Sequence, residues 1–274
     1  MSMTGRMTAA ATIAAALIGS LAFFLATMGL GIGLVLANAA VSPQVVWFPL
    51  PLLALLVGIT AAAEWRFRIG LRTEARLNPQ PQARSRASIT AMTLGIALVG
   101  VAACVLQGAL ASMTLAAETG PAGTSRLFQF SYAVLLSVTP AVLAEVAFRG
   151  LLQSRLEPLW GPWPAILLIT AINTAAHRWG PDLAAQWLGY FVALAGLGWL
   201  RSVTGSLWPP LLAHTLTNLA IALALWHFGP FAQGGIGDLG RVALVALLGA
   251  GFLVARIGMQ PKTGSPRSGH SGTS

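Results

Sequence analysis

The sequence predicts an all-α polytopic membrane protein, a bundle of about eight transmembrane helices. Of its 274 residues, 56% are hydrophobic and only 8% are charged, against about 25% charged in ordinary soluble domains. The charges lie mostly in short segments between long apolar runs. So few charges cannot cover a water-facing surface, whereas a bilayer favours an apolar one.

The apolar runs give the expected spans in chain order. They cover about 7–36, 45–65, 88–116, 127–148 (or as far as 157), 164–178, 183–200, 207–226 and 241–258. Residues 1–258 therefore form one predicted transmembrane helical domain. The polar segment 259–274, rich in Ser and Gly, is predicted to be a disordered tail.

The net charge of +9 is explained by membrane topology. The loop 66–86 carries six Arg and one Glu, and with eight spans it shares a side with Arg6, Arg201 and the tail. The positive-inside rule then predicts that both termini are cytoplasmic. Cations placed between apolar runs favour a lipid partner and no nucleic acid. The Arg-rich, Ala-rich composition suggests a bacterial inner (plasma) membrane protein.

Four polar residues interrupt the apolar helices: Glu145, His177, His214 and Asn218. At 1.5 Å per residue, Glu145 and Asn218 lie about 17–18 Å from the predicted cytoplasmic ends of their helices. His177 reaches a similar depth, and His214 lies at about 10 Å. All four are therefore expected in one layer of the bundle. A carboxylate is costly to bury in lipid and is usually kept for a function.

The spacing of these residues suggests pairs. Glu145 and Arg149 are four residues apart on one helix face, which predicts an ion pair. His214 and Asn218 also share a face, either as hydrogen-bond donors to one substrate oxygen or as interhelical contacts that stabilise the bundle. Asn173 shares a face with His177 and is expected to support it.

The local sequences resemble the CPBP family of intramembrane glutamic endopeptidases, which is related to the CAAX-prenyl protease of the Rce-one type and is also called the abortive-infection family. The first family motif is matched by Glu145-Val-Ala-Phe-Arg149-Gly150. The second corresponds to Asn173-Thr-Ala-Ala-His177, and the third to His214-Thr-Leu-Thr-Asn218 after the lead-in Gly205-Ser-Leu-Trp-Pro209. The motifs follow in the family's order over about 140–220.

The resemblance implies hydrolysis of a membrane-anchored protein or peptide, or of a C-terminal sorting or processing segment, with no cofactor. The family's carboxylate activates water with help from the residue matched by His177. His214 and Asn218 would donate hydrogen bonds to the oxyanion, and Arg149 would orient the carboxylate. The family usually has two adjacent Glu, and the first is Ala144 here. Glu145 can take its place only through a helix rotation or a shifted substrate path, because adjacent helix residues point about 100° apart.

Two alternatives remain from the residues alone. The first is a zinc-dependent membrane protease with Glu145, His177 and His214 as ligands, although no His-Glu-x-x-His pair is present. The second is a non-catalytic relative that acts as a membrane immunity or scaffold protein, which Ala144 favours. Because Cys104 is the only cysteine, a disulfide within the chain and a cysteine-based metal site are excluded.

Overall fold

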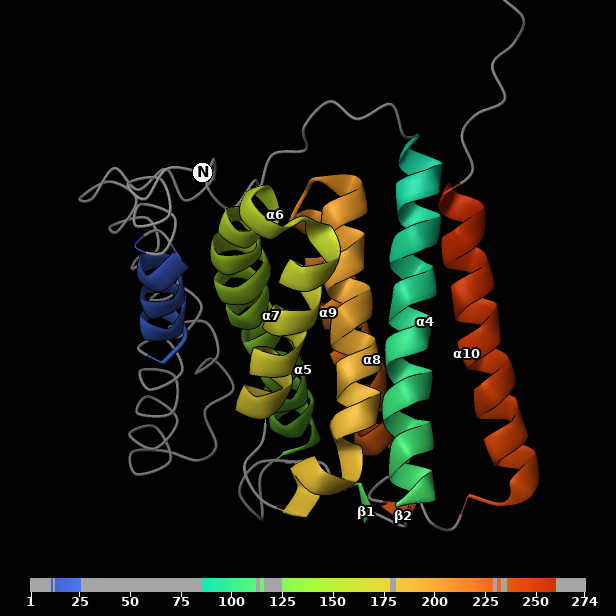
Figure 1. The fold of residues 1–274 in the computed structure, drawn as a ribbon. Helices are drawn as coiled ribbons and strands as arrows, with labels where there is room; N and C mark the ends of the chain where they lie inside the picture. The colour runs from blue at the N-terminus through green and yellow to red at the C-terminus, as the bar shows by residue number, and fades with distance from the viewer. Residues whose placement is uncertain are drawn as a thin grey trace, which may run out of the picture.

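In the computed structural model, helices stand side by side with nearly parallel axes (Figure 1). The structure describes residues 11, 13–25, 85–111, 114–115, 125–177, 181–228, 231–232 and 236–259. The predicted second span, the arginine-rich loop except for its last residues, and the tail from 260 onward lie outside these residues. The predicted count of about eight spans, the domain limits and the disordered tail therefore stay predictions.

The six helical spans predicted between 88 and 258 are helices in the structure. They are α4 (Arg86–Leu110), α5 (Arg126–Ala144) with η1 (Glu145–Gln153) and α6 (Ser154–Trp160), α7 (Pro162–His177), α8 (Pro181–Thr204), α9 (Trp208–Phe228) and α10 (Asp238–Met259). A shorter apolar helix covers Ile13–Leu25. Among the described helices, α4 and α10 are both long and apolar enough to cross a membrane by length and composition.

The turns that join these helices follow from local sequence. Gly161 (φ 83°) and Gly205 (φ 62°) adopt left-handed backbone conformations that suit glycine. Their N–H groups donate to the carbonyls of Glu157 and Arg201, both at 2.9 Å, and so close the last turns of α6 and α8. Pro162 then stands at the start of α7, where a missing N–H costs little.

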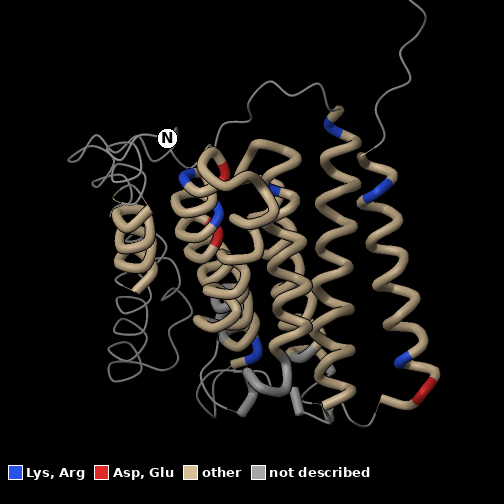
Figure 2. Tube along the Cα trace, viewed as in Figure 1, with Lys and Arg blue, Asp and Glu red and all other residues tan. Residues whose placement is uncertain are grey.

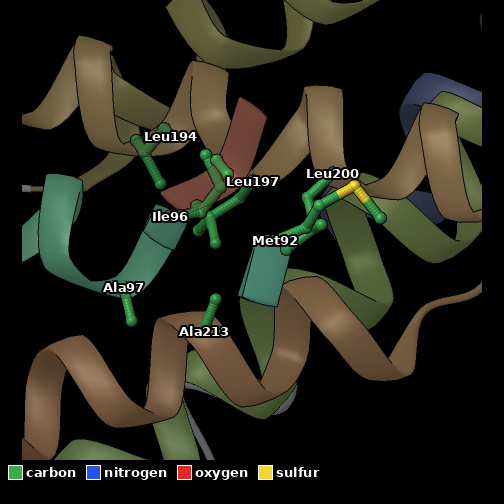
Figure 3. Packing of buried hydrophobic residues seen from close by; sticks show 8 residues of the cluster. Met92, Ile96, Ala97, Leu194, Leu197, Leu200 and Ala213 are labelled. Atoms are coloured by element: carbon green, nitrogen blue, oxygen red, sulfur yellow. The ribbon is translucent and has the colours of Figure 1, made fainter. Parts of the chain in front are cut away.

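Helix α4 packs closely against α10 because small residues meet at their crossing. A Cβ atom built on Gly95 would lie 2.6 Å from the backbone N of Ala255 and from the carbonyl of Gly251. Helices associate in a membrane through such close packing, since lipid provides no hydrophobic driving force between them. On another side of α4, Met92 and Ile96 pack into a buried cluster with Leu197, Leu200 and Ala213 of α8 and α9 (Figure 3).

One feature was not predicted from the sequence. Thr114–Leu115 (β1) and Phe231–Ala232 (β2) form a two-stranded antiparallel sheet in which Thr114 is opposite Ala232. The pair joins the segment after α4 to the segment before α10 at one end of the bundle (Figure 1). The fold is therefore a helical bundle with one small sheet at its end.

The charged residues gather at the two ends of the bundle and are sparse along its length (Figure 2). The end opposite the sheet contains the start of α4, all of α6 and the ends of α8 and α10. It carries Arg86, Arg155, Arg201, Arg256 and Glu157, whereas the sheet end carries Arg126, Arg241 and Asp238. The end opposite the sheet is therefore the more cationic end, and the side of a membrane that it faces stays a prediction.

Candidate functional site

The first motif lies on a π-helix. Helix α5 ends at Ala144, and Glu145–Gln153 continue it with π-helical hydrogen bonding before α6 resumes the α-helix. Each π turn takes up one residue more than an α turn, and π segments occur frequently at functional sites. The side chains from Glu145 to Gln153 are therefore rotated relative to those of an uninterrupted α-helix. The residues that the sequence singled out, Glu145 and Arg149, both lie in this segment.

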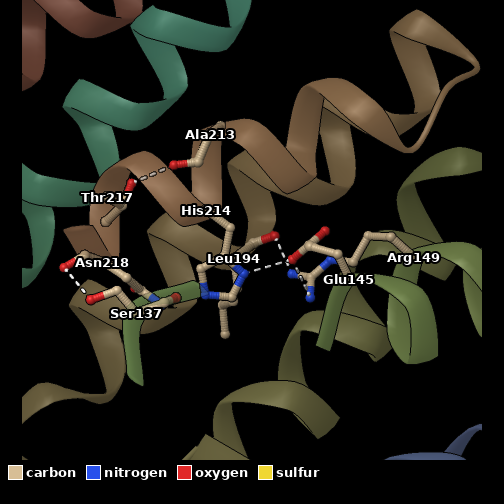
Figure 4. A network of polar contacts seen from close by, with 8 residues as sticks. All are labelled: Ser137, Glu145, Arg149, Leu194, Ala213, His214, Thr217 and Asn218. Atoms are coloured by element: carbon tan, nitrogen blue, oxygen red, sulfur yellow. Dashed lines mark hydrogen bonds and ion pairs between the residues drawn. The ribbon is translucent and has the colours of Figure 1, made fainter. Parts of the chain in front are cut away.

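A buried carboxylate is held by two basic side chains from two helices (Figure 4). Glu145 is fully buried, and its Oε1 lies 2.9 Å from Nδ1 of His214 on α9. The same Oε1 lies 3.4 Å from NH1 of Arg149, an i,i+4 ion pair whose two side chains are both completely enclosed. The predicted Glu145–Arg149 pair is thus confirmed, and His214 joins it from a helix 69 residues further along.

The second carboxylate oxygen has no such partner. Oε2 of Glu145 is buried and accepts no hydrogen bond from the described residues. A buried polar atom normally has a partner, and an exception invites a functional explanation. Arg149 fixes the other oxygen from a rigid position, because its NH2 donates to the Leu194 carbonyl of α8 at 2.9 Å. Of the two carboxylate oxygens, Oε2 is therefore the one without a hydrogen bond from the described residues.

His214 is 5% exposed, and its Nδ1 is the ring nitrogen that contacts Glu145. Nε2 makes no hydrogen bond with the described residues. An ionised carboxylate accepts a hydrogen bond from Nδ1–H, so the ring is oriented with Nε2 turned away from Glu145. This arrangement leaves one imidazole nitrogen for substrate.

Asn218 lies one turn beyond His214 on α9 and is half-buried. Its Nδ2 donates to the backbone carbonyl of Ser137 at 3.2 Å. The Ser137 hydroxyl lies 3.4 Å from the backbone carbonyl of Asn218, and its shorter hydrogen bond goes to the Ala133 carbonyl at 2.7 Å. The contact joins α9 to α5. One of the two amide N–H groups is thereby engaged in the bundle, and the other is left for a further acceptor. The two functions considered from the sequence, interhelical contact and oxyanion donor, are compatible in this geometry.

A column of polar side chains leads from Glu145 toward the cationic end of the bundle. It consists of Glu145, Arg149, Gln153 and Glu157, spaced four residues apart. Gln153 is fully buried, and its Nε2 donates to Glu157 at 2.7 Å and to the Gly198 carbonyl at 2.8 Å. Sequence reasoning identified only the first two members, although the four-residue spacing was a signal that extends to all four.

The hydrogen bonds of this column set the register of the neighbouring helices. Gln153 and Arg149 reach the carbonyls of Gly198 and Leu194, which are likewise four residues apart on α8. At the Gln153 level, Ile166 of α7 contacts Gly198. Asn173 and Thr174 come seven and eight residues further along α7, and Glu145 comes eight residues back along η1. From these similar offsets we infer that Asn173 and Thr174 lie near the level of Glu145.

Two buried donors on α7 accompany the free carboxylate oxygen at that level. Asn173 and Thr174 are 1% and 6% exposed, and neither Nδ2 nor Oγ1 has a hydrogen-bond partner among the described residues. His177, one turn beyond Asn173, is the last residue of α7. Its side chain lies outside the described residues, as does its predicted contact with Asn173. The structure therefore brings Glu145, Arg149 and His214 together and leaves the contribution of His177 a prediction.

Ala144 has a different environment from Glu145. It is 5% exposed and packs in an apolar cluster with Phe148, Leu152 and Ile169. The ring of Phe148 also lies 5.2 Å from that of Phe24 in the helix Ile13–Leu25. A carboxylate at position 144 would meet apolar side chains here, so the polar surroundings of the site belong to position 145.

The possibility of a metal site depends on three convergent ligands. Within the described residues, no group of three or more His, Cys, Asp and Glu side chains could hold a metal ion. The zinc alternative needs His177 as its third ligand, and the His177 side chain lies outside the described residues. Within the described part of the chain, the ion-pair partners of the Glu145 carboxylate are Arg149 and His214. A guanidinium beside a carboxylate competes with a metal cation for that carboxylate.

Comparisons with known proteins agree with the motif resemblance. Residues 126–220 match the family described as Type II CAAX prenyl endopeptidase Rce1-like. The matched segment begins at the start of α5 and ends within α9. It contains all three motifs and the Glu145–His214 contact. No curated protein and no solved structure was found to match the chain.

Proposed function

We propose that this membrane protein, Rce1-like over residues 126–220, is an intramembrane endopeptidase in which Glu145 activates water. The observation that carries the proposal is the buried contact between Glu145 Oε1 and His214 Nδ1 at 2.9 Å. It leaves Oε2 and Nε2 as the two atoms of the pair without a hydrogen bond to the described residues. A general base and an oxyanion donor are the two groups that peptide hydrolysis needs.

The proposed reaction has two steps. Oε2 of Glu145 takes a proton from water while the water oxygen bonds to the scissile carbonyl carbon, and the carbonyl oxygen becomes an oxyanion. In this proposal His214 acts as an imidazolium: its Nδ1–H donates to Glu145 Oε1, and its Nε2–H, together with the second amide N–H of Asn218, donates a hydrogen bond to that oxyanion. The proton on Glu145 then passes to the leaving nitrogen as the C–N bond breaks. The products are a carboxylic acid and an amine.

The neighbouring residues have supporting roles in this proposal. Arg149 neutralises the buried carboxylate and holds Oε1, so that Oε2 keeps its direction. Asn173 is a positioning residue at the same level, where its unpartnered Nδ2 would orient the attacking water. His177, which ends α7, would assist Glu145 from the next turn. The π-helix that begins at Glu145 changes the directions of the side chains that follow Glu145, Arg149 among them, relative to a continuous α-helix.

The proposed setting and substrate follow from the family and the charge distribution. The protein would lie in a bacterial inner membrane with both termini in the cytoplasm, and the site would be reached from within the bundle. Its partner would be a membrane-anchored protein or peptide, or a C-terminal sorting or processing segment. The reaction as written uses no cofactor and no zinc.

The second candidate is a non-catalytic membrane relative that acts in immunity or as a scaffold. The observation that favours it is the apolar cluster around Ala144, where the family usually has a carboxylate. In that case the Glu145–Arg149–His214 contacts would serve only to hold the bundle together. The two candidates differ in whether changes that preserve folding remove hydrolysis.

Substrate discovery and site variants test the proposal together. First, membranes that contain the wild-type protein or the His214→Gln variant would be compared for newly formed peptide termini. Purified protein would then be assayed with peptides that cover the cleaved sites and with a prenylated CAAX-type peptide. We expect cleavage that falls about 100-fold or more in His214→Gln and also in His177→Ala. His227→Ala is the matched control, since His227 is exposed near the end of α9.

Two results would contradict the proposal. The same set of newly formed peptide termini in wild-type and His214→Gln membranes would favour the non-catalytic candidate. Activity that chelators remove and zinc restores would favour the metal-dependent one.

A further inference from the structure

A pocket lies at the cationic end of the bundle, away from the proposed hydrolytic site. Its volume is about 390 Å³, and it lies where α6, α7 and α8 meet. Its lining combines one carboxylate, two indoles, one hydroxyl and three apolar side chains: Glu157, Trp163, Trp199, Ser202, Pro162, Ile166 and Val203. None of these residues takes part in the proposed reaction.

The carboxylate of Glu157 is fixed in place without being neutralised. Its Oε1 accepts hydrogen bonds from Gln153 Nε2 at 2.7 Å and from the Ser202 hydroxyl. Both donors are uncharged. Glu157 forms no ion pair with any described residue, and its Oε2 accepts no hydrogen bond from them. A partly buried carboxylate held only by neutral donors is complementary to a cation.

The two tryptophans specify the kind of cation. Trp163 from α7 and Trp199 from α8 line the pocket together with Glu157. An indole face attracts an ammonium group, and such pairs contribute about 0.5–2 kcal/mol depending on desolvation. Aromatic side chains combined with an anionic group suit primary and quaternary ammonium ions.

The surroundings of the pocket favour a lipid as the source of that ammonium. Leu159, Trp160 and Leu167 are 42%, 43% and 48% exposed on α6 and α7, and Trp163 is 59% exposed. Large apolar side chains on the outside of a membrane bundle contact acyl chains, and tryptophans near helix ends occupy the headgroup region. We propose that this pocket binds the ammonium headgroup of a zwitterionic phospholipid, with Glu157 as the anionic partner and Trp163 and Trp199 as the aromatic walls.

Lipid retention by the full-length protein tests this proposal independently of any protease activity. Protein in detergent would be equilibrated with equal amounts of phosphatidylethanolamine and phosphatidylglycerol, and bound lipids would be counted by native mass spectrometry. We expect a preference for phosphatidylethanolamine that falls about fivefold or more in Glu157→Gln. Gln at this position can still accept the hydrogen bonds from Gln153 and Ser202, so folding is expected to persist. Trp199→Leu should lower the same preference.

The control is Asp238→Asn, which removes an exposed carboxylate at the opposite end of the bundle and should leave lipid preference unchanged. Equal retention of the two lipids by the wild-type protein would overturn the proposal, as would an unchanged preference in Glu157→Gln. A lysine side chain of a peptide is the other possible source of an ammonium group. To test it, a lysine-containing peptide would be added to protein equilibrated with phosphatidylglycerol alone. Peptide binding that depends on Glu157, without any preference for phosphatidylethanolamine, would also overturn the lipid assignment.

Discussion

His214 Nδ1 and Glu145 Oε1 lie 2.9 Å apart although 69 residues separate them in the sequence. The contact joins η1 to α9 in the interior of the bundle, where both side chains are buried. Arg149 shares the same carboxylate oxygen at 3.4 Å. Because removing one partner would leave an uncompensated buried charge, the three side chains depend on one another in the fold.

The first prediction concerns Arg149. Arg149→Met leaves the Glu145 carboxylate enclosed without its guanidinium, and removing one partner of a buried ion pair typically costs about 3–5 kcal/mol. The double variant Glu145→Gln/Arg149→Met should lose less stability than the two single losses added together, by about 1 kcal/mol or more. Unfolding in mixed micelles measures each variant. Arg241→Met, whose partner Asp238 is exposed, is the control and should change stability little. Strictly additive losses would contradict a buried ion pair.

The second prediction separates stability from function at Asn173. Its buried Nδ2 has no hydrogen-bond partner among the described residues, and such a group destabilises a fold by about 1–3 kcal/mol. Asn173→Leu should therefore keep or raise the unfolding free energy while lowering cleavage at least tenfold. A steeper fall in kcat than in substrate affinity is expected, because the proposed task of Asn173 is to orient water. If Asn173→Leu unfolds more easily and cleaves normally, Asn173 is structural only.

The third prediction tests the contact between α4 and α10. Gly95→Ala places a Cβ 2.6 Å from the α10 backbone, so the helices must separate, at a cost of about 1–3 kcal/mol. Gly249→Ala on α10 is the matched control, since nothing lies within 4 Å of its Cβ position, and it should be neutral or mildly stabilising. The same unfolding assay compares them, and equal behaviour of the two variants would refute the close crossing.

The fourth prediction addresses the missing family carboxylate. Ala144→Glu places a charge among Phe148, Leu152 and Ile169, where no described cation compensates it. We expect lower stability, and no recovery of cleavage when this change is added to Glu145→Gln. Ala144→Ser, a smaller change, should be tolerated. Recovery of cleavage in Ala144→Glu/Glu145→Gln would mean that position 144 still faces the substrate.

The sequence was sufficient to predict the helices, because long apolar runs bounded by Gly, Pro and Arg leave few other structures in a membrane. It also predicted the Glu145–Arg149 ion pair from a four-residue spacing, and that Glu145 and His214 lie in one layer of the bundle. What it could not indicate is the π-helix from Glu145 to Gln153, since hydropathy does not record the number of residues per turn. The β1–β2 pair was missed because two-residue strands leave no periodic pattern.

Contacts that depend on precise rotation were likewise beyond the sequence. Depth alone did not indicate which oxygen of Glu145 meets His214, nor that Asn218 binds Ser137 on α5. Ser137 lies in an apolar run with no charged neighbour, so nothing in its local sequence marks it. The register along η1, α7 and α8 becomes visible only through the carbonyls that Arg149 and Gln153 contact.

The most direct test of Glu145 as the base is the single-turnover cleavage rate of Glu145→Gln in reconstituted liposomes, with the identified peptide substrate. Gln keeps the shape of the side chain and removes its ability to take a proton from water. The predicted result is a rate lowered by about 10²–10⁴-fold, with the protein still folded by its unfolding curve and substrate binding retained. A rate within about threefold of the wild-type value in folded Glu145→Gln would contradict the proposed role of Glu145.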